Sequence, residues 1–486
     1  MTQSPSVKLE RIDACRVRIP KDAVPGMRVD GIIYADETLM KSVGQDPCVS
    51  QVANVATLPG IVKHSLAMPD IHFGYGFCIG GVAATDPENG GVISPGGVGY
   101  DINCGVRLIR SDLAGGELRS RVAKLTDSLF QHVPCGVGEG GEVRLKGRDL
   151  DDVLSRGSAA VIERRYGVPD DAEVTEARGA LDGADPGCVS DRARQRGQGQ
   201  CGTLGSGNHF IEIQVVEEVF DAEAAEALGL KAGQVTVMIH SGSRGLGHQV
   251  CDDAIRDLRG VPKAYGIDLP DRQLVCAPVH SKEGQHYLKA MRSAANFAWA
   301  NRQIMTHLVR QAFSEVLDRP WEALGMHLVY DVAHNISKME TFEVGGARKS
   351  LCVHRKGATR AYPPGHPEVP PRYRKVGQPV IIPGDMGRCS YVLVGQPGAM
   401  ESTFGSTCHG AGRLLSRHAA IRAAKGRSIQ KELAARGVYA RARSRAGLDE
   451  EQPDAYKNVQ DVVSVVEKAG LSRIVCRLRP LGVIKG

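Results

Sequence analysis

Apolar and polar positions follow both helical and strand-like spacing along this chain. Helices are expected where apolar residues recur every three or four positions, at 117–132, 150–165, 288–317, 413–438 and 458–470. Strands are expected where short apolar runs are bounded by turn residues, at 104–109, 209–220, 234–243, 326–335 and on both sides of a turn in 378–395. Loops are expected where glycine, proline and polar residues collect, at 136–148, 178–207 and 360–373.

The order of these elements is irregular. Helices and strands do not alternate in a sustained way, so the pattern favours a mixed α+β fold over a doubly wound sheet or a TIM barrel. The 486 residues allow about three average domains or one large one. Glycine is enriched, at 58 residues, without a collagen-like period. Such enrichment is typical of tight turns and of backbone that approaches a ligand closely.

Cysteine usage and hydropathy indicate the compartment. The 13 cysteines show no pairs at zinc-finger spacing, and the N-terminal segment lacks the apolar stretch of a signal peptide. No apolar run is long enough for a transmembrane helix. We therefore expect free thiols in a reducing compartment, a cytoplasmic location and no membrane partner.

Five side chains with metal-binding chemistry lie in a glycine-rich loop or near the ends of expected strands. They are Asp101, Cys104, His209, His240 and His334. The two last histidines each end an apolar run and are each expected to enter a polar loop at a sheet edge. One thiolate, three imidazoles and one carboxylate could bind one or two divalent ions, and these residue types by themselves favour zinc. The spacing is not diagnostic, because polar residues that merely end strands would show the same pattern.

Several glycine-rich loops could direct backbone N–H groups at phosphate oxygens. They read SPGGVGYD, GTLGSGNH, SGSRGLGH, IPGDMG and CHGAGR. The last loop contains His409 just before an expected helix, where a neutral imidazole could attack a bound phosphate and form a covalent bond. The alternatives are ordinary turns for the loops and a capping or packing role for His409.

Positive charge is concentrated after His409. The net charge of the chain is only +6, yet 413–445 contains ten Lys or Arg residues and one acid. A second basic stretch, 348–375, contains eight Lys or Arg residues and one acid. Either stretch could be a solvated face, but their position beside candidate phosphate loops favours binding of a polyanion. Because aromatic residues make up only 5% of the chain, backbone phosphate contacts are favoured over a large base-stacking surface.

Taken together, the motifs resemble the RtcB family of 3′-phosphate RNA ligases. The matching segments run in order from about residue 17 to Gly486 and read MPDIHFGYGF, GGVGYDINCGVR, LGSGNHFIE, HSGSRGLGH, DVAHN, VHRKGATRA, PGDMG, SYVLVG, CHGAGR and LGVIKG. Each motif is modest in specificity, but ten collinear motifs are very specific. The resemblance implies a single α+β domain over 1–486 with a central metal site.

The resemblance also implies the reaction. Family members join an RNA 2′,3′-cyclic phosphate or 3′-phosphate end to a 5′-hydroxyl end, with GTP as co-substrate and two Mn²⁺ ions per site. The reaction passes through a guanylylated histidine and then a guanylylated RNA 3′ end, in tRNA splicing or RNA repair. RNA is therefore the expected partner, and an activator of the archease type is a further expected partner.

Site residues follow from the resemblance position by position. His409 corresponds to the guanylylated nucleophile, and the five candidate ligands correspond to the manganese ligands, with Cys104 bridging two ions. The implied guanine-nucleotide contacts are Asn208, His209, Phe210, Ile211, Glu212, His334, Asn335, Pro383, Gly384, Asp385, Met386, Ser390, His409, Gly410, Ala411, Gly412, Tyr456 and Lys485. Lys485 implies that the C-terminus folds into the site. The candidates for RNA phosphates are Arg196, Arg244 and Arg417.

One position departs from the family pattern, because Asp385 stands where Ser or Thr is usual in the PG-x-MG loop. We expect its carboxylate to face the guanine edge; the alternative is a position near the phosphates, with Arg388 as partner. Two other functions stay open: a metal-dependent phosphoesterase acting on RNA ends without nucleotide, and a non-catalytic RNA-binding protein. A covalent GMP adduct on His409 would distinguish the ligase from both.

Overall fold

The computed structural model describes residues 7–44 and 46–486, so residues 1–6 and 45 of the predicted domain lie outside the described part. Its centre is a mixed, mostly antiparallel sheet with the order β11-β7-β9-β8-β19-β16-β15, in which β18 pairs with β19 in parallel. These strands are β7 (Gly105–Ala114), β8 (Phe210–Val219), β9 (Gln234–Ser241), β11 (His327–Ala333), β15 (Pro379–Ile382), β16 (Ser390–Gly395), β18 (Tyr439–Ala442) and β19 (Ser472–Lys485).

A second sheet has the order β1-β2-β3-β4-β5-β13-β12. Its strands are β1 (Glu10–Arg11), β2 (Arg16–Ile19), β3 (Asp30–Tyr34), β4 (His64–His72), β5 (Ile79–Thr85), β12 (Asn335–Val344) and β13 (Ala347–Lys356). Two small ribbons complete the strands, formed by β6 (Val92–Ile93) with β10 (Ala277–Pro278) and by β14 (Ala358–Arg360) with β17 (Ser406–Cys408). The observed mixture of sheets and helices confirms the predicted α+β class.

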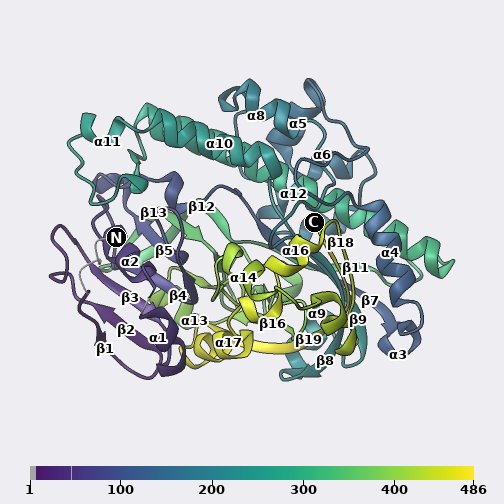
Figure 1. The fold of residues 1–486 in the computed structure, drawn as a ribbon. Helices are drawn as coiled ribbons and strands as arrows, with labels where there is room; N and C mark the ends of the chain where they lie inside the picture. Colours follow the sequence, from purple (N-terminus) through teal and green to yellow (C-terminus); the bar gives the residue numbers. More distant parts are fainter. Residues whose placement is uncertain (1–6, 45) are drawn as a thin grey trace.

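Helices cover the sheets unevenly (Figure 1), with α10 and α12 above and the C-terminal elements over the middle of the view. The helices are α1 (Glu37–Val43), α2 (Cys48–Val55), α3 (Gly115–Leu118), α4 (Val122–His132), α5 (Arg148–Arg156), α6 (Ser158–Ile162), α7 (Pro169–Glu173), α8 (Asp191–Gly197), α9 (Ala222–Leu228), α10 (Arg244–Asp257), α11 (Val261–Ala264), α12 (Lys282–Leu317), α13 (Pro397–Ser402), α14 (Arg417–Ala423), α15 (Ile429–Ala435), α16 (Arg445–Glu450) and α17 (Val459–Lys468). Among the described residues, none of these helices has the length and apolarity needed to cross a membrane.

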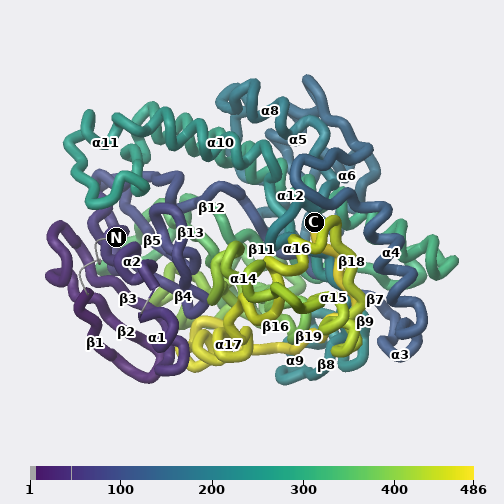
Figure 2. Tube along the Cα trace, viewed as in Figure 1, coloured from purple at the N-terminus to yellow at the C-terminus, as the bar shows by residue number. Residues whose placement is uncertain are grey.

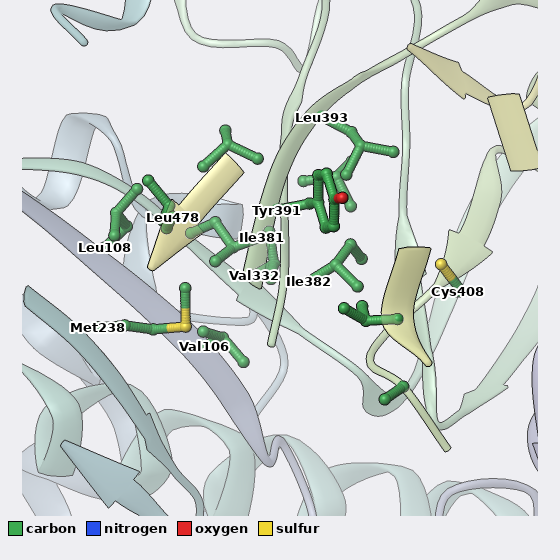
Figure 3. Close-up of a cluster of buried hydrophobic side chains, with 14 of the residues drawn as sticks. Val106, Leu108, Met238, Val332, Ile381, Ile382, Tyr391, Leu393, Cys408 and Leu478 are labelled. Atoms are coloured by element: carbon green, nitrogen blue, oxygen red, sulfur yellow. The ribbon is translucent and has the colours of Figure 1, made fainter. Parts of the chain in front are cut away.

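The interior is continuous between distant parts of the chain. The largest cluster of buried apolar side chains extends from Cys15 to Ile484. Figure 3 shows part of it, where side chains of β7, β9, β11, β15, β16 and β19 meet. Figure 2 shows the C-terminal segment beside the N-terminal strands, and α17 packs against β4. Every residue of β9, β15 and β16 is buried, so apolar side chains on both faces of these strands contribute to the core.

The long helix predicted at 288–317 is confirmed as α12, although it begins six residues earlier at Lys282. Ser281 caps it, accepting a hydrogen bond from the Gly284 N–H, which satisfies one of the free donors of the first turn. The predicted strands at 209–220 and 234–243 are confirmed as β8 and β9. The C-terminal strand β19 lies inside the central sheet and ends at Lys485.

Three local predictions are wrong. The segment 413–438 forms two helices, α14 and α15, because Gly426 adopts φ +82° and interrupts the helical path. Gly157, with φ +54°, similarly divides the helix expected at 150–165 into α5 and α6. The loop expected at 178–207 contains α8, whose N-terminus is capped by Ser190.

Candidate metal and nucleotide site

The five predicted metal ligands come together at one edge of the central sheet. The order β11-β7-β9-β8 is antiparallel throughout, so the start of one strand lies beside the end of its neighbour. Gly105 pairs with both Ser241 and Ala333, and His240 pairs with Phe210. Residues next to these pairs therefore meet although they are far apart in sequence. His334 lies between β11 and β12 and not in the polar loop that the sequence predicted, since β12 begins at Asn335.

The ligand atoms form two groups that share Cys104. One group joins Cys104 with His240 and His334, and the other joins it with Asp101 and His209; within each group the ligand atoms lie within 4.8 Å of one another. The Cys104 Sγ lies 3.3 Å from Nε2 of His209 and 3.3 Å from Nε2 of His240. Nε2 of His209 lies 2.9 Å from the Asp101 carboxylate. This arrangement can hold two cations that share the sulfur atom.

Burial sets the protonation of the cluster. It lowers the pKa of His240 and His334 well below the ordinary value, so both imidazoles are neutral and can act as ligands. Burial and the nearby Asp101 raise the pKa of the Cys104 thiol. Burial disfavours the Asp101 carboxylate, but the contact with His209 and the charges of His248 and Arg244 together outweigh burial and lower the pKa of Asp101. A bound cation would displace the thiol proton, as in other thiolate sites.

The donor set fits a divalent transition metal. Nε2 atoms of His240 and His334 face each other at 3.3 Å, and Nδ1 of His334 is buried without a partner among the described residues. Backbone and amide groups fix the ligands: Nδ1 of His209 lies 3.0 Å from the Leu204 carbonyl oxygen, and the Ser243 N–H donates to Asp101. Such outer contacts orient ligands for a metal. The donors alone do not select manganese over zinc.

A cavity adjoins the cluster and contains most of the predicted nucleotide contacts. The predicted residues that line it are Asn208, Phe210, Glu212, His334, Asn335, Pro383, Gly384, Asp385, Met386, Ser390, His409, Gly410, Ala411, Gly412, Tyr456 and Lys485. Ile211 does not line the cavity, and its side chain is buried in the hydrophobic core. The side chain of His209 belongs to the metal cluster, with its Nε2 beside Asp101 and Cys104.

His409 lies in this cavity and is held by Asp70. The Asp70 carboxylate accepts hydrogen bonds from the N–H groups of His409 and Gly410, and one of its oxygens lies 2.6 Å from Nδ1 of His409. Burial opposes ionisation of Asp70, but His409 outweighs it and lowers the pKa of Asp70. The ring centroids of His409 and His334 are 4.7 Å apart. The Nε2 edge of His409 is therefore free of Asp70.

Comparison with known proteins was consistent with this geometry. The family model described as "tRNA-splicing ligase RtcB" matches residues 51–486. The chain belongs to the RtcB family. It is 55% identical over 480 residues to the tRNA-splicing ligase RtcB of Thermococcus kodakarensis, covering 99% of each chain. It is 55% identical over 478 residues to the protein of that name from Archaeoglobus fulgidus, covering 98% of this chain and 99% of that one. It is 52% identical over 438 residues to the RNA-splicing ligase RtcB of Mycobacterium bovis, covering 90% and 100%.

Sequence reasoning did not single out Asp70 in this RtcB chain, although it lies within the motif MPDIH. Asp70 is fully buried at the end of the apolar strand β4, and such a carboxylate needs a partner. The signal available in the sequence was a carboxylate within the apolar run of β4. Gly412 makes the contact feasible, because a Cβ at this residue would lie 2.2 Å from the Asp70 carbonyl oxygen. Its φ of +73° also favours glycine.

Glu451 is a second residue that the sequence did not indicate. Its buried carboxylate accepts hydrogen bonds from Tyr456 and, at 2.8 Å, from Arg413, and it lies 3.6 Å from Nζ of Lys485. Nζ of Lys485 also donates to the Gly207 carbonyl oxygen. Burial disfavours the ionised form of Glu451, but Lys485 and Arg413 outweigh it and lower its pKa. Glu451 thus joins three segments of the cavity wall.

The Asp385 carboxylate is engaged by its own loop. One oxygen accepts hydrogen bonds from the N–H groups of Gly387 and Arg388, and the other lies 2.6 Å from Nε of Arg388. Burial raises the pKa of Asp385, and Arg388 opposes that shift. The pairing with Arg388 is the one that the alternative to the guanine-edge prediction requires.

The three arginines predicted to bind RNA differ in exposure. Arg417 lines the cavity, and its side chain is 60% exposed. Arg196 is exposed and donates to the Gln249 side chain. Arg244 is buried at the start of α10, where its Nε donates to the Thr203 hydroxyl. Of the three, Arg417 is the one at the wall of the nucleotide cavity.

Proposed function

We propose that this protein is an RNA ligase of tRNA splicing that joins 3′-phosphate or 2′,3′-cyclic phosphate ends to 5′-hydroxyl ends, with GTP and Mn²⁺. The observation that carries the proposal is one cavity containing His409, held by Asp70, beside the metal ligands and the buried Glu212. The names of the relatives, tRNA-splicing and RNA-splicing ligase, support the RNA substrate. An archease-type activator is a further proposed partner.

Asp70 prepares His409 as the nucleophile. The close approach of its carboxylate to Nδ1 favours the neutral imidazole that carries its proton on that nitrogen, which leaves the lone pair of Nε2 available. Nε2 forms a bond to the α-phosphorus of GTP while the bond to the bridging β-phosphate oxygen breaks, and pyrophosphate leaves. When bound by Asp101, Cys104, His209, His240 and His334, two Mn²⁺ ions would neutralise phosphate charge and polarise the phosphorus atoms.

The guanylylated His409 then transfers GMP to the RNA 3′ end. A 2′,3′-cyclic phosphate is first opened: water attacks its phosphorus while the bond to the 2′-oxygen breaks, which leaves a 3′-phosphate and a 2′-hydroxyl. An oxygen of the RNA 3′-phosphate attacks the phosphorus on His409, and the bonding electrons return to Nε2. The 5′-hydroxyl oxygen of the second RNA attacks the activated 3′-phosphorus and loses its proton to water, while GMP leaves. Arg196, Arg244 and Arg417 are the proposed cations for RNA phosphates.

Base recognition rests on Glu212, Tyr456 and Lys485 of the cavity wall. Glu212 is buried and can accept hydrogen bonds from N1–H and the N2 amine of guanine, groups that adenine lacks. Tyr456 offers its ring to the base, and its hydroxyl is held by Glu451. Lys485 is held in place by Gly207 and Glu451. These contacts favour a guanine nucleotide over an adenine nucleotide.

Labelling with [α-³²P]GTP and Mn²⁺ tests the proposal directly. The wild-type protein should retain label after denaturation, and His409→Ala should retain none. His409→Ala should still seal RNA that carries a preformed guanylylated 3′ end, because that step does not need the histidine adduct. Label persisting on His409→Ala would contradict the assignment, and processing of RNA ends without any labelled protein would indicate a phosphoesterase.

A further inference from the structure

A row of aromatic rings lies outside the nucleotide cavity. The ring centroids of Tyr75 and Tyr100 are 5.6 Å apart in an edge-to-face arrangement, and those of Tyr100 and His248 are 5.8 Å apart. Tyr75 and Tyr100 are partly exposed and His248 is exposed. In an edge-to-face pair one ring presents its edge, so its faces are not covered by the partner.

The aromatic row is adjacent in sequence to the candidate metal ligands. Tyr100 directly precedes the ligand Asp101, and Asp101 is among the charges that act on His248. At the other end, the loop that contains Tyr75 follows His72, which lines the nucleotide cavity. Phe73, which directly follows His72 in this loop, is 56% exposed. Short stretches of chain therefore connect the aromatic row to the candidate metal ligands and to the nucleotide cavity.

Hydrogen bonds to its backbone fix the loop that presents Tyr75, and the Tyr75 ring takes no part in them. Gly74 exchanges two hydrogen bonds with the Gln51 side chain, and the Gly76 N–H donates to Gln273. Nζ of the buried Lys356 donates to the Tyr75 carbonyl oxygen. These contacts hold the loop while the Tyr75 ring stays at the surface. A rigid aromatic ring loses little entropy when a ligand stacks on it.

The charges beside the row are mixed. Apart from burial, the pKa of Tyr75 is raised by the charge of Asp271 and lowered by the charges of the exposed Arg259 and Arg272. Apart from burial, the charge of Asp252 raises the pKa of both Tyr100 and His248. Arg196 also acts on His248. Such a surface offers stacking more than net charge, which suits nucleobases of a single strand.

We propose that Tyr75, Tyr100 and His248 form a stacking platform for the unpaired nucleotides of an RNA end that enters the metal site. The inference rests on the proposed RNA ligase function and adds a path for the strand. The expected ligand is single-stranded RNA in which successive bases stack on the rings, in a way that tolerates different base sequences.

Binding of RNA with an unpaired 3′-phosphate end, measured by fluorescence anisotropy, tests the platform. Tyr75→Ala with Tyr100→Ala should weaken binding about tenfold or more, whereas Tyr75→Phe with Tyr100→Phe should stay within about twofold. The salt dependence should not change, because no cation is lost. The matched control is Phe220→Ala, which removes a 50% exposed ring at the far end of β8 and should bind as wild type.

Abasic RNA makes the test specific for bases. Removing the bases of the last three nucleotides, a number set by the three rings, should weaken binding to wild type about as much as the double alanine variant does. The two changes together should add little, because both delete the same contact. Equal losses for abasic RNA on wild type and on the double variant would overturn the platform, as would wild-type affinity of the double variant.

Two controls separate failure of the platform from other failures. GMP labelling of the wild-type protein tests the proposed ligase function independently, and the RNA binding result stands whether or not labelling occurs. If the double alanine variant does not fold, Tyr75→Leu with Tyr100→Leu keeps apolar volume without a ring and should show the same loss. Wild-type affinity of the leucine pair would also overturn the proposal.

Discussion

The candidate metal ligands and the basic segment 413–445 are both conspicuous in the sequence, but folding affects them differently. It brings the ligands together, whereas it separates the basic residues and pairs most of them with acids. The cluster collects candidate ligands that lie as far apart in the sequence as Asp101 and His334, and the Nε2 atoms of His240 and His334 face each other. The basic segment is contiguous in sequence, and folding divides it among α14, α15, β18 and the start of α16. Its cations then meet acids from other parts of the chain.

Most of the arginines in 413–445 are paired. The pairs are Arg413 with Glu451, Arg417 with Glu450, Arg427 with Glu432 and Asp454, Arg441 with Asp127, Arg443 with Glu139, and Arg445 with Asp449. Within the described residues, Arg422 has no ion pair. A charge count over a window of sequence therefore overstates the free charge, because acids outside the window neutralise it. Residue type predicts candidate metal ligands more reliably than a charge count predicts free charge, because each ligand keeps its donor atom in the folded chain.

The largest expected effect concerns the shared sulfur. Cys104→Ser should lower ligation by about 100-fold or more and exceed the loss in Asp101→Asn, because Sγ belongs to both ligand groups. Elemental analysis and Mn²⁺ titration of both variants would measure metal content and activity. Equal losses in the two variants would mean that the sulfur serves a single ion, and the contrast between the two regions would weaken.

A second effect concerns pH. Burial raises the pKa of Glu212 to about 8, with Gln214 opposing the shift and Asp385 adding to it. The carboxyl is therefore protonated below that pH, whereas guanine N1–H and N2 need an acceptor. Affinity for guanosine and GTP should rise up to about tenfold per pH unit until about pH 8 and then level off.

Calorimetry in buffers of different ionisation enthalpy should detect proton release on binding near neutral pH. Guanosine is the informative ligand, since it carries no phosphate that titrates in this range. Glu212→Gln should remove the pH dependence. A pH profile that is unchanged in Glu212→Gln would place the titrating group elsewhere.

A smaller effect should separate arginines with a long ion pair or none from closely paired arginines. Nε of Arg417 lies 3.9 Å from the Glu450 carboxylate and Arg422 has no ion pair among the described residues, whereas Arg441 and Arg443 lie 3.0 and 2.6 Å from their acids. Neutralising Arg417 and Arg422 to Gln should reduce the slope of log affinity for RNA against log salt by about 1.4 in total. The matched pair Arg441→Gln and Arg443→Gln removes cations already paired with Asp127 and Glu139 and should change the slope less. RNA binding titrations at several salt concentrations would measure both. Equal slopes for the two pairs would show that ion pairs within the chain do not withhold charge from RNA.

The smallest effect is expected at Asp385, a paired charge inside the nucleotide site. Because its carboxylate is engaged by Arg388 and two backbone N–H groups, Asp385→Ser should change the ratio of GTP to ATP affinity by less than about threefold. Equilibrium binding of both nucleotides would measure the ratio. A change of tenfold or more would show that Asp385 contacts guanine after all.

The sequence itself determined the elements with strong local signals. The amphipathic pattern of α12 and the apolar runs of β8 and β9 follow from residue type and spacing, and the choice of the five candidate ligands follows from residue type and from the family motifs. Local signals also existed where the prediction was wrong. Gly426 lies in the middle of the segment 413–438, and its left-handed backbone divides that segment, although the apolar spacing on each side continues as in one helix.

Only the tertiary structure decided which partners the site residues have. The antiparallel order of β11, β7, β9 and β8 places one end of each strand at the same edge, and no local pattern encodes that order. Asp70 and Glu451 become important because His409, Tyr456 and Lys485 arrive from distant segments and need buried partners. A ligand type is a property of one residue, whereas a shared metal site or a neutralised charge is a property of contacts between residues distant in the chain.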